Sequence, residues 1–430
     1  MLRRAFLLSS LAVALSGCGE TGEYGGYYPH AGAGYSGFGN VPMGQPLTLA
    51  PGAGQVQGPG GGRVAILLPL SGGLSEVGQA MLQAAQLAFA TPGAPELDVK
   101  DTGGSPQGAA AAAHAAVAER AGIILGPLTA GETAAVAPIA RSAGIAVLAF
   151  TNDPAVAQPG VWTLGITPVQ QVRRLVAAAQ AQGRTQFAAL LPSNALGQAM
   201  GRGLREATTD AGLPPPAIRF HGPGMQSINV AVRGLSGYGS RRAAIDAKIK
   251  ADRDKGTQAS LQEARELSRT AVPPPSFDAL LLADTGEALE EIAALLPYYY
   301  VDRSHVRILG PSLWASPSSG SGNMAGGWYA APCPAARVGL VQEFTAKYGT
   351  APPQVAGLAF DAASIARVMG GGEGYSASAL TRTAGFLGTD GWLALQPNGQ
   401  VRRGLAVFRV GSGGGEMIDP APRSGGGAGT

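Results

Sequence analysis

The turn that follows the first long apolar run is the strongest candidate for binding an anion. It lies in VAILLPLSGGLSEVGQAM, residues 64–81, where an apolar run, a glycine turn and a helical pattern follow one another. Phosphate loops have this order and require G-x-x-x-x-G-K-[ST]. Gly73 and Gly78 have the right gap, but Gln79 and Ala80 replace the lysine and the hydroxyl residue. We therefore expect no nucleotide site, and the turn is either a pocket for a small anion at a helix N-terminus or a structural turn.

Other signatures of catalysis are missing from the chain. No G-x-S-x-G motif, which marks the nucleophile of many hydrolases, occurs in it. The four histidines are far apart, and no two have the spacing of metal ligands: His30, His114, His221 and His305. Asp and Glu are scattered without a pattern. We expect a protein that is not an enzyme and that holds no metal and no cofactor.

Composition limits the class of partner. The chain has 430 residues, of which only 14% are charged, and this length is enough for two domains with buried cores. The net charge is +3, and no block of Lys and Arg is long enough to follow a nucleic-acid backbone. We therefore expect no nucleic acid partner.

The N-terminus has the pattern of a bacterial lipoprotein signal. Arg3 and Arg4 precede an apolar stretch at residues 5–15, which is too short to span a bilayer. The LSGC that follows resembles a lipobox, whose cysteine is lipidated and becomes the new N-terminus, although an ordinary signal peptide shares the rest of the pattern. We expect residues 1–18 to be the lipoprotein signal segment and Cys18 to carry the lipid that anchors the protein to the membrane.

The residue after the lipobox cysteine bears on which membrane holds the anchor. An Asp at this position favours the inner membrane, so Gly19 favours the outer membrane and the periplasmic face of the cell envelope. With Cys18 lipidated, a disulfide framework is not expected. Cys333, in APCPAAR, is then expected to be a small, buried, apolar side chain.

Two segments are predicted to be disordered. Residues 19–62 hold 15 glycines, several prolines and no hydrophobic periodicity, so they cannot bury enough surface to fold. We expect them to form a tether between the anchor and the folded part. The tail at residues 412–430 has a similar composition, and we expect it to be disordered as well.

Between these segments, short apolar runs alternate with helical patterns. The strand-like runs are at residues 64–70, 97–101, 122–127, 145–150, 186–192, 217–222, 277–284, 306–311 and 326–332. The helical patterns are at residues 77–90, 105–121, 129–143, 167–183, 195–212, 285–299, 340–349 and 355–369. A final hairpin, at residues 391–410, turns at Asn-Gly. This alternation predicts an α/β fold with parallel, doubly wound sheets in two lobes, the chain crossing between them.

One segment departs from the charge-poor average. Residues 241–270 hold 13 of the chain's 59 charged residues. They form either a solvated helix with paired charges or an exposed element that docks onto a partner. In the second case the candidate docking residues are Arg241, Arg242, Asp246, Lys248, Glu263 and Arg265.

The order of several motifs resembles a known family. AILLPLSG, IILGPL, AVLAFTND, FDALLLAD, GGWYAAP and FDAASIA are followed by the ending GFLGTDGWLALQPNGQVRRGLAVFRV. Together, over residues 63–411, they resemble lipoproteins of the penicillin-binding protein activator family, which are related to the leucine/isoleucine/valine-binding proteins.

The resemblance implies a fold and a division of the chain. The fold is α/β, with two Rossmann-like lobes of type I periplasmic-binding-protein architecture. Lobe 1 is expected at residues 63–166 with 334–385, and lobe 2 at residues 167–333 with 386–411. The charged helical insertion belongs to lobe 2.

The resemblance also implies a ligand site that is only half retained. The cleft positions that hold a ligand carboxylate in amino-acid receptors correspond to Ser71, Gly72, Thr129, Ala149, Thr151 and Asn152. The positions that hold the ammonium group correspond to Ser312 and Leu196, where an acidic and an aromatic residue are usual. A buried ammonium without a carboxylate is costly. An amino-acid zwitterion is therefore disfavoured, whereas an uncharged or anionic ligand is not.

Two functions are compatible with the resemblance. The first is a non-enzymatic, lipid-anchored periplasmic protein that regulates a peptidoglycan synthase, a penicillin-binding protein. The alternative is the substrate-binding component of an ABC transporter for amino acids or related solutes, whose partner is the ABC permease. The resemblance favours the first.

Overall fold

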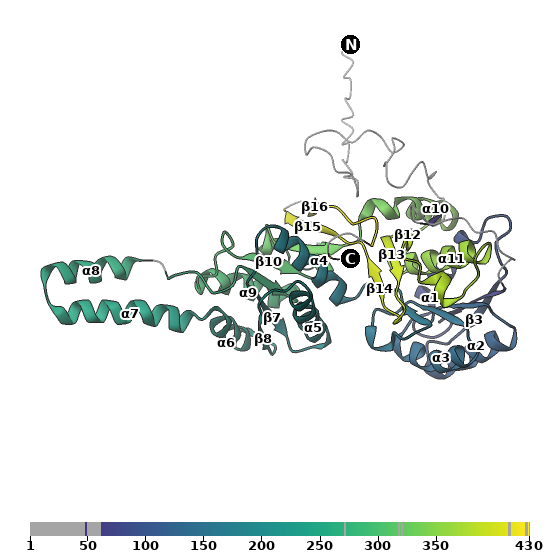
Figure 1. The fold of residues 1–430 in the computed structure, drawn as a ribbon, viewed down its shortest axis with the longest axis horizontal. Helices are drawn as coiled ribbons and strands as arrows, with labels where there is room; N and C mark the ends of the chain where they lie inside the picture. The colour runs from purple at the N-terminus through teal and green to yellow at the C-terminus, as the bar shows by residue number, and fades with distance from the viewer. Residues whose placement is uncertain are drawn as a thin grey trace, which may run out of the picture.

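The protein consists of two α/β lobes and a helical arm (Figure 1). The structure, a computed structural model, describes residues 48–49, 62–270, 272–316, 319, 321–411, 414–425 and 429. Each lobe has a largely parallel sheet with helices packed on both faces. The predicted α/β class with two lobes is confirmed. Residues 1–18 and most of the predicted tether lie outside the described residues.

Lobe 1 is built on a five-stranded parallel sheet in the order β3-β2-β4-β5-β6. Its strands are β2 (Val64–Leu68), β3 (Leu97–Asp101), β4 (Ile123–Leu125), β5 (Ala146–Ala149) and β6 (Val161–Thr163). Its helices are α1 (Ser75–Ala88), α2 (Pro106–Ala118), α3 (Ala130–Ser142), α10 (Val338–Tyr348), α11 (Ala356–Gly370) and α12 (Ala377–Leu380).

Burial on both faces explains the apolar sequence of the first strand. Ile66 packs with α1 and α11 on one face of the sheet, and Leu67 packs with α2 and α3 on the other, since neighbours along a strand point to opposite faces. Such a strand reads as an unbroken apolar run instead of an alternating one.

Lobe 2 is built on a seven-stranded sheet in the order β16-β15-β11-β10-β9-β7-β8. Its strands are β7 (Phe187–Pro192), β8 (Ala217–His221), β9 (Ala279–Leu282), β10 (Arg307–Gly310), β11 (Trp328–Ala331), β15 (Ala406–Gly411) and β16 (Gly414–Asp419). Helices α4 (Pro168–Ala181) and α5 (Ala195–Asp210) pack on one face, and α6 (Met225–Ser236) and α9 (Gly286–Tyr298) on the other. Short 3-10 turns lie at Pro154–Val156, Ser312–Ala315, Ser321–Met324 and Pro334–Arg337.

A small antiparallel sheet corrects the predicted division of the chain. It consists of β1 (Thr48–Leu49), β12 (Phe386–Gly388), β13 (Gly391–Leu395) and β14 (Val401–Arg403). The sequence assigned residues 386–411 to lobe 2, but Phe386, Leu393 and Val401 pack in the core of lobe 1. The physical reason is that the apolar face of this sheet covers the lobe 1 core, and the chain enters lobe 2 only at Leu405.

Two segments predicted to be disordered contain ordered strands. Within the predicted tether, Thr48 and Leu49 pair antiparallel with Leu387 and Phe386. Within the predicted tail, β16 pairs antiparallel with β15 and extends the sheet of lobe 2. Both strands complete an edge that a neighbouring strand leaves open, which the glycine-rich composition does not reveal.

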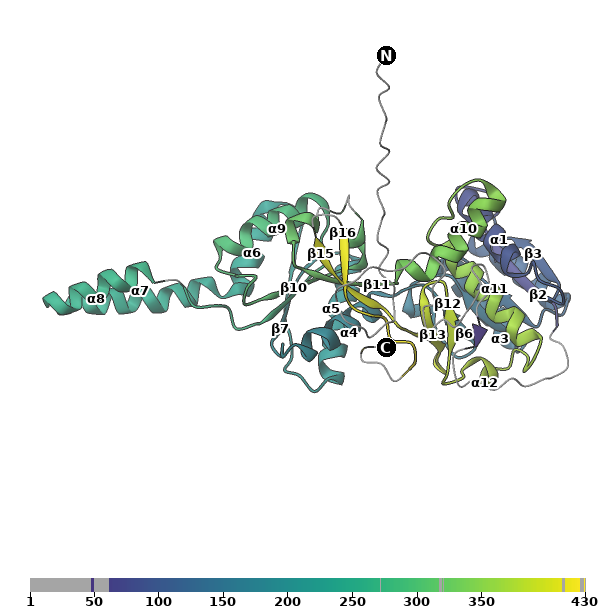
Figure 2. The same ribbon diagram turned by 90° about the horizontal axis from the view of Figure 1, so that it is seen from above.

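The charged segment forms an arm of two antiparallel helices. They are α7 (Tyr238–Lys255) and α8 (Gln258–Arg269), joined at Gly256, whose φ of 65° ends the first helix in the left-handed region. A small apolar core holds the helices together through Ile245, Ile249 and Ala264. The arm projects from lobe 2 on the side away from lobe 1, in both views (Figures 1 and 2).

A buried charged cluster lies between α11 and the small sheet. Asp361 and Asp390 are both buried, as is Arg403, whose guanidinium donates a hydrogen bond to the carbonyl of Leu164. Asp361 Oδ1 accepts a hydrogen bond of 2.8 Å from the backbone of Thr389. Burial, together with the charge of Asp390, raises the pKa of Asp361 to about 7, and burial also raises the pKa of Asp390.

We predict that the stability of the protein falls as the pH rises from about 4 to about 7. An unfolded Asp titrates near pH 3.9, so over this range the folded protein holds a proton that the unfolded chain has lost, and rising pH favours unfolding. The Asp361→Asn variant lacks this titrating group. Between pH 5 and pH 8, its free energy of unfolding should therefore fall by about 2–4 kcal/mol less than that of the natural protein.

Denaturant unfolding at both pH values measures the effect. The control is Asp254→Asn, which removes an exposed carboxylate of the arm and should leave the pH dependence unchanged. An Asp361→Asn variant with the pH dependence of the natural protein would contradict the prediction.

Candidate functional site

The predicted ligand residues of lobe 1 lie at one edge of its sheet. Ser71 follows β2, Thr129 follows β4 and Thr151 follows β5. The carboxyl ends of parallel strands meet at the same edge, where α/β proteins bind ligands. The structure therefore brings the predicted hydroxyl groups to a common edge. What occupies their hydrogen bonds decides whether a ligand can bind there.

The donors in the turn at Ser71 are taken by a carboxylate of the chain itself. Asp101 Oδ1 accepts hydrogen bonds from the backbone of Leu70 at 2.9 Å, Ser71 at 3.2 Å and Gly103 at 2.8 Å. Hydrogen bonds from the Ser71 side chain and the Gly103 backbone lower the pKa of Asp101. The turn that remained a candidate for an external anion thus already holds one. Gly72, at φ 77°, has the left-handed conformation that this turn requires.

The donors at Thr129 are taken in the same way by Glu132. Glu132 Oε2 accepts from the backbone of Thr129 at 2.9 Å and from its hydroxyl at 2.8 Å. Glu132 Oε1 accepts from the hydroxyl of Thr102 at 2.5 Å. The carboxylate is buried, and Thr129 Oγ1 in turn accepts from the backbone of Glu132, which completes a capping box at the start of α3.

The remaining predicted residues of lobe 1 differ in exposure. Thr151 is buried and its Oγ1 accepts from the backbone of Asp153 at 3.1 Å. Ala149 is a buried residue of β5. Asn152 is exposed, and its backbone packs so closely on Gly165 that a side chain there would collide with it. Of the predicted hydroxyls, Thr151 is the one whose hydrogen atom has no carboxylate acceptor among the described contacts.

Lobe 2 presents a buried acid–base pair that the sequence did not predict. His221 ends β8 and Asp284 follows β9, and their Nε2 and Oδ2 atoms are 3.2 Å apart. Nδ1 of His221 contacts the carbonyl of Gly222 at 2.9 Å. Burial opposes the charged imidazolium, but the hydrogen bonds to Asp284 and Gly222 raise the pKa of His221 on balance. The sequence separates the pair by 63 positions, and only the shared strand β7 between β8 and β9 brings them together.

Ser312 and Leu196 correspond to the positions that bind the ligand ammonium group in amino-acid receptors, and here both contact other parts of the chain. The backbone N–H of Ser312 donates to the side chain of Gln171 at 2.8 Å. Leu196 is partly buried against the core of lobe 2. Neither is an acidic residue, and the expectation that an amino-acid zwitterion is disfavoured stays a prediction.

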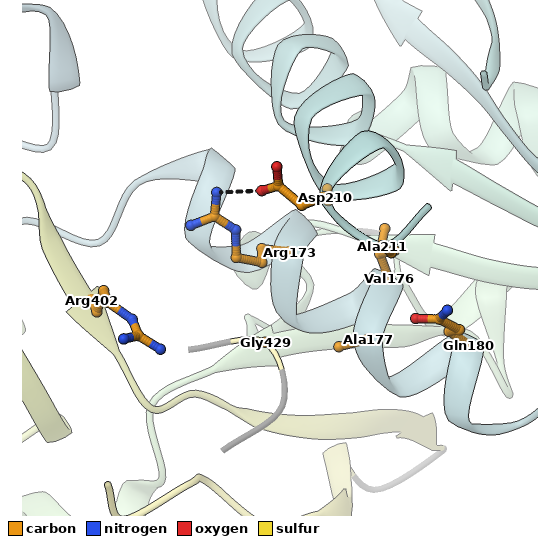
Figure 3. A pocket seen from close by; sticks show the side chains of 9 residues that line it. Arg173, Val176, Ala177, Gln180, Asp210, Ala211, Arg402 and Gly429 are labelled. Atoms are coloured by element: carbon orange, nitrogen blue, oxygen red, sulfur yellow. Dashed lines mark hydrogen bonds and ion pairs between the residues drawn. The ribbon is translucent and has the colours of Figure 1, made fainter. Parts of the chain in front are cut away.

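Two cavities lie on lobe 2, away from the predicted residues. The first has a volume of about 440 Å³, and its lining includes Arg173, Asp210, Arg402 and Gly429 (Figure 3). Arg173 and Asp210 form an ion pair at 3.2 Å, and Arg402 donates to the carbonyl of Gly425 at 2.7 Å. The second, of about 370 Å³, is lined by α9, Arg303 and Asn323. Neither is lined by a predicted ligand residue, and the charged groups of the first, Arg173, Asp210 and Arg402, already have partners within the chain.

The predicted docking residues differ in what they contact. Arg241 is half-buried and donates to the carbonyls of Tyr299, at 2.8 Å, and Pro273, so it fixes the arm to lobe 2. Arg242 and Asp246 pair with each other at 3.1 Å. The remaining three are exposed, and none forms a salt bridge within the described part of the chain: Lys248, Glu263 and Arg265.

Cys333 is buried, as expected, in the core of lobe 2. It is also disulfide-bonded, which differs from the expectation that the chain has no disulfide. The other cysteine of the sequence, Cys18, lies outside the described residues.

Comparison with known proteins identifies the family of the fold. A model of the periplasmic binding protein family matches residues 62–414. A protein from Rhodospirillum rubrum, assigned as a branched-chain amino acid ABC transporter, superposes with a TM-score of 0.63 at 19% identity, covering 83% of this chain and 100% of that one.

Two structures of LpoA from Haemophilus influenzae are also similar. Its C-domain, described as a regulator of PBP1A, has a TM-score of 0.58 at 16% identity and covers 83% of this chain and 99% of that one. Full-length LpoA has a TM-score of 0.59 at 16% identity, with 85% of this chain and 60% of that one covered. These likenesses show a shared fold.

One curated relative matches part of the chain. The uncharacterized protein RP748 of Rickettsia prowazekii (strain Madrid E) is 25% identical over 174 residues, which are 40% of this chain and 47% of the relative. The match thus spans about half the length of that relative.

We predict that Glu132→Ala destabilises the protein by about 1–3 kcal/mol, because it leaves the Thr129 backbone donor and the Thr102 hydroxyl without an acceptor in a buried place. Denaturant unfolding measures the loss. The matched control is Glu76→Ala, an exposed acid in the first turn of α1, which should cost less than about 0.5 kcal/mol. Equal effects of the two substitutions would contradict a structural role for the Glu132 carboxylate.

Proposed function

The chain belongs to the periplasmic binding protein family, and we propose that within it this protein is a non-enzymatic regulator of a peptidoglycan synthase, a penicillin-binding protein. Membership of the family implies a periplasmic location. Within the described ranges, no helix is long and apolar enough to cross a membrane.

The observation that carries the proposal is the internal occupation of the lobe 1 donors. An incoming carboxylate at Ser71 would compete with Asp101, and one at Thr129 would compete with Glu132. Either would bring two negative charges together and would have to displace hydrogen bonds that also hold the fold. The sequence allowed an anionic ligand at this edge. The occupied hydrogen-bond donors at Ser71 and Thr129 argue against such a ligand. A protein that cannot use this edge for a solute is suited to acting through its outer surface.

The arm supplies such a surface. It projects from lobe 2 away from lobe 1 (Figure 2), and exposed charges such as Lys248 and Arg265 lie along it. In the proposal, the arm reaches the synthase and no ligand cycle is needed. The likeness of the fold to the LpoA C-domain, described as a regulator of PBP1A, supports the compatibility of this fold with such a function.

A second candidate function is the substrate-binding component of an ABC transporter, with a permease as partner. It is favoured by the Rhodospirillum rubrum structure, which the chain matches over that protein's whole length, and by the retained hydroxyl of Thr151. Its ligand would be uncharged, because in the described part of the chain Asp101 and Glu132 occupy donors of the lobe 1 edge and Asp284 of the lobe 2 edge is paired with His221.

We predict that the full chain captures a penicillin-labelled protein from detergent-solubilised envelopes of the source bacterium. Penicillin acylates the active-site serine of penicillin-binding proteins, so a fluorescent penicillin identifies the class of the captured partner. Replacing residues 239–269 with a short glycine linker should reduce capture at least tenfold. Because the arm has its own small core, this deletion should leave both lobes folded, which circular dichroism checks.

Two outcomes would overturn the regulator proposal. One is that the full chain captures no penicillin-labelled protein. The other is that calorimetry against amino acids, amides and other small solutes finds a ligand with micromolar affinity, which would favour transport. Capture that survives the deletion would leave the regulator proposal standing and remove the arm from it.

The membrane anchor is a further part of the proposal. In it, Cys18 carries the lipid and residues 19–62 form the tether, with the outer membrane as the site of anchoring. Cys333 is disulfide-bonded, and a sulfur atom joined to lipid cannot also form a disulfide. The lipid proposed on Cys18 therefore excludes this cysteine as the disulfide partner of Cys333 in the anchored protein.

We predict that Cys18→Ser moves the protein from the membrane fraction to the soluble fraction, because lipid attachment needs the thiol. Fractionation of cells and the intact mass of the protein measure this. The control is Cys333→Ser, which should stay in the membrane fraction. A mature natural protein whose mass shows no added lipid would refute the anchor.

A further inference from the structure

Exposed tyrosines surround the root of the arm. Tyr298, at the end of α9, is 68% exposed, and Tyr300, two residues further on, is 42% exposed. Monomer surfaces rarely expose contiguous apolar side chains of this size without a use. Val230 of α6 is also 68% exposed, and α6 packs beside α9 in lobe 2.

The tyrosines form one packed cluster with the first residue of the arm. The ring of Tyr238 stacks on Tyr300 at 6.1 Å and meets the edge of Tyr299 at 5.3 Å. Tyr298 meets Tyr299 at 5.0 Å. Arg241, one turn into α7, donates to the carbonyl of Tyr299 at 2.8 Å. These contacts fix the exposed rings relative to the arm, so little conformational entropy would be lost when a partner covers them.

The backbone of Tyr300 has a strained conformation, so forming the tyrosine cluster costs conformational energy. Its φ is 55°, in the left-handed region, which a bulky aromatic residue rarely adopts. Glycine would take this conformation without strain. A strained tyrosine whose ring is nearly half exposed gains little from burial within the chain, and strain of this kind gathers at functional sites.

We propose that Tyr298 and Tyr300 are the anchor residues of a docking surface that binds an acidic face of a partner protein, with the arm as its cationic flank. The identity of that partner as a peptidoglycan synthase rests on the function proposed above. Tyrosine is among the residues that carry most of the binding energy in protein interfaces, and charged flanks set the rate and the choice of partner.

The distribution of charge supports an acidic partner. Residues 241–270 hold eight of the chain's 31 Lys and Arg and five of its 28 Asp and Glu, so the rest of the chain carries 23 of each. The whole net charge of +3 therefore resides in the arm. Four exposed basic residues of the arm form no salt bridge within the described part of the chain: Lys248, Arg253, Arg265 and Arg269.

The same distribution favours a protein over an anionic membrane. Five acidic residues alternate with the basic ones, and several are held in pairs along the helix, such as Lys250 with Asp254 at 3.1 Å. A membrane surface attracts each Lys or Arg and repels each Asp or Glu. A protein can match a mixed pattern residue by residue.

Site-specific photo-crosslinking in the source bacterium tests the docking surface. Benzoylphenylalanine replaces Tyr298 or Tyr300 in the full chain, and the matched controls carry it at Leu313 of lobe 2 and Leu74 of lobe 1, which are also exposed. We expect a crosslink to a penicillin-labelled protein at positions 298 and 300 that is at least tenfold stronger than at the controls.

The outcomes separate the two proposals. A strong crosslink at positions 298 and 300 to one protein that penicillin does not label keeps the docking surface and overturns the synthase as partner. A penicillin-labelled protein that is captured by the full chain but crosslinks no better at these positions than at the controls overturns the docking surface alone. No crosslink above the controls to any protein overturns it as well.

Binding measurements on the captured protein test the two components. Tyr298→Ala should weaken binding about 10- to 30-fold, mainly through faster dissociation. Lys248→Glu combined with Arg265→Glu should slow association and weaken its salt dependence. Tyr300→Gly removes the ring and relieves the backbone strain. We expect it to weaken binding without lowering thermal stability, which would show that the ring acts in docking and not in folding. Leu313→Ala is the control.

Vesicle binding tests the competing class of partner. The Cys18→Ser protein is sedimented with vesicles of phosphatidylglycerol, with and without Tyr298→Ala. We expect no binding that depends on Tyr298, and binding that does would overturn the protein-docking proposal in favour of a membrane surface.

Discussion

The carboxyl edge of the lobe 1 sheet imposes the constraint on which the rest of this structure depends. Parallel strands that end together leave backbone donors and hydroxyl groups facing one edge, and these donors pair with acceptors of the chain, with water or with a ligand. Here two carboxylates of the chain supply them: Asp101 for the turn at Ser71, and Glu132 for the start of α3. The donors at Ser71 and at the start of α3 are therefore occupied by hydrogen bonds within the fold and are not free to bind a solute. The hydroxyl groups of Thr129 and Thr151, which the sequence predicted to contact a ligand, form hydrogen bonds within the protein.

A second set of internal contacts joins the lobes. Gln170 of α4 donates to the carbonyl of Val401 in β14, and Arg403 donates to the carbonyl of Leu164 where the chain leaves lobe 1. The C-terminal segment lies over the same junction, with Arg402 donating to Gly425 and Arg174 donating to Pro420. Of these, the bonds from Gln170 to Val401 and from Arg402 to Gly425 run between segments of the two lobes, and movement of one lobe against the other would have to break them. Arg403 also acts on the buried carboxyls of Asp361 and Asp390, because burial raises the pKa of each and the positive charge of Arg403 opposes this rise.

The regular part of the fold was predictable because its signal is local. An unbroken apolar run such as Val64–Leu68 and the capping residues of α3 are visible in a few consecutive residues. The sequence did not predict which lobe the last hairpin packs against. The apolar residues of β12 and β13 would fit the core of either lobe, and only the tertiary structure shows that they pack in lobe 1. The predicted ligand residues Ser71, Thr129 and Thr151 follow strands that end at one edge, and their binding of a ligand stays a prediction. Asp101 and Glu132 were not predicted as acceptors for this edge. The T-x-x-E spacing of Thr129 and Glu132 is a capping-box signal that the sequence does carry. Nothing in the sequence around Asp101 distinguishes an acid that faces backbone donors from one that faces water. The pair of His221 and Asp284 depends on three neighbouring strands and has no signal in the sequence.

The arm also bears on how such a protein can change over time. It leaves lobe 2 after Gly237 and returns before β9, and its contacts with itself are made by a few apolar residues such as Ile245 and Ile249. With 18 residues, α7 carries its tip about 27 Å along the helix axis, so substitutions there touch neither sheet. The specificity of the protein and the stability of its lobes can therefore diverge independently. An exchange of the arm between relatives would replace the charged flank of the proposed docking surface and leave its tyrosines, Tyr298 and Tyr300, in place on lobe 2.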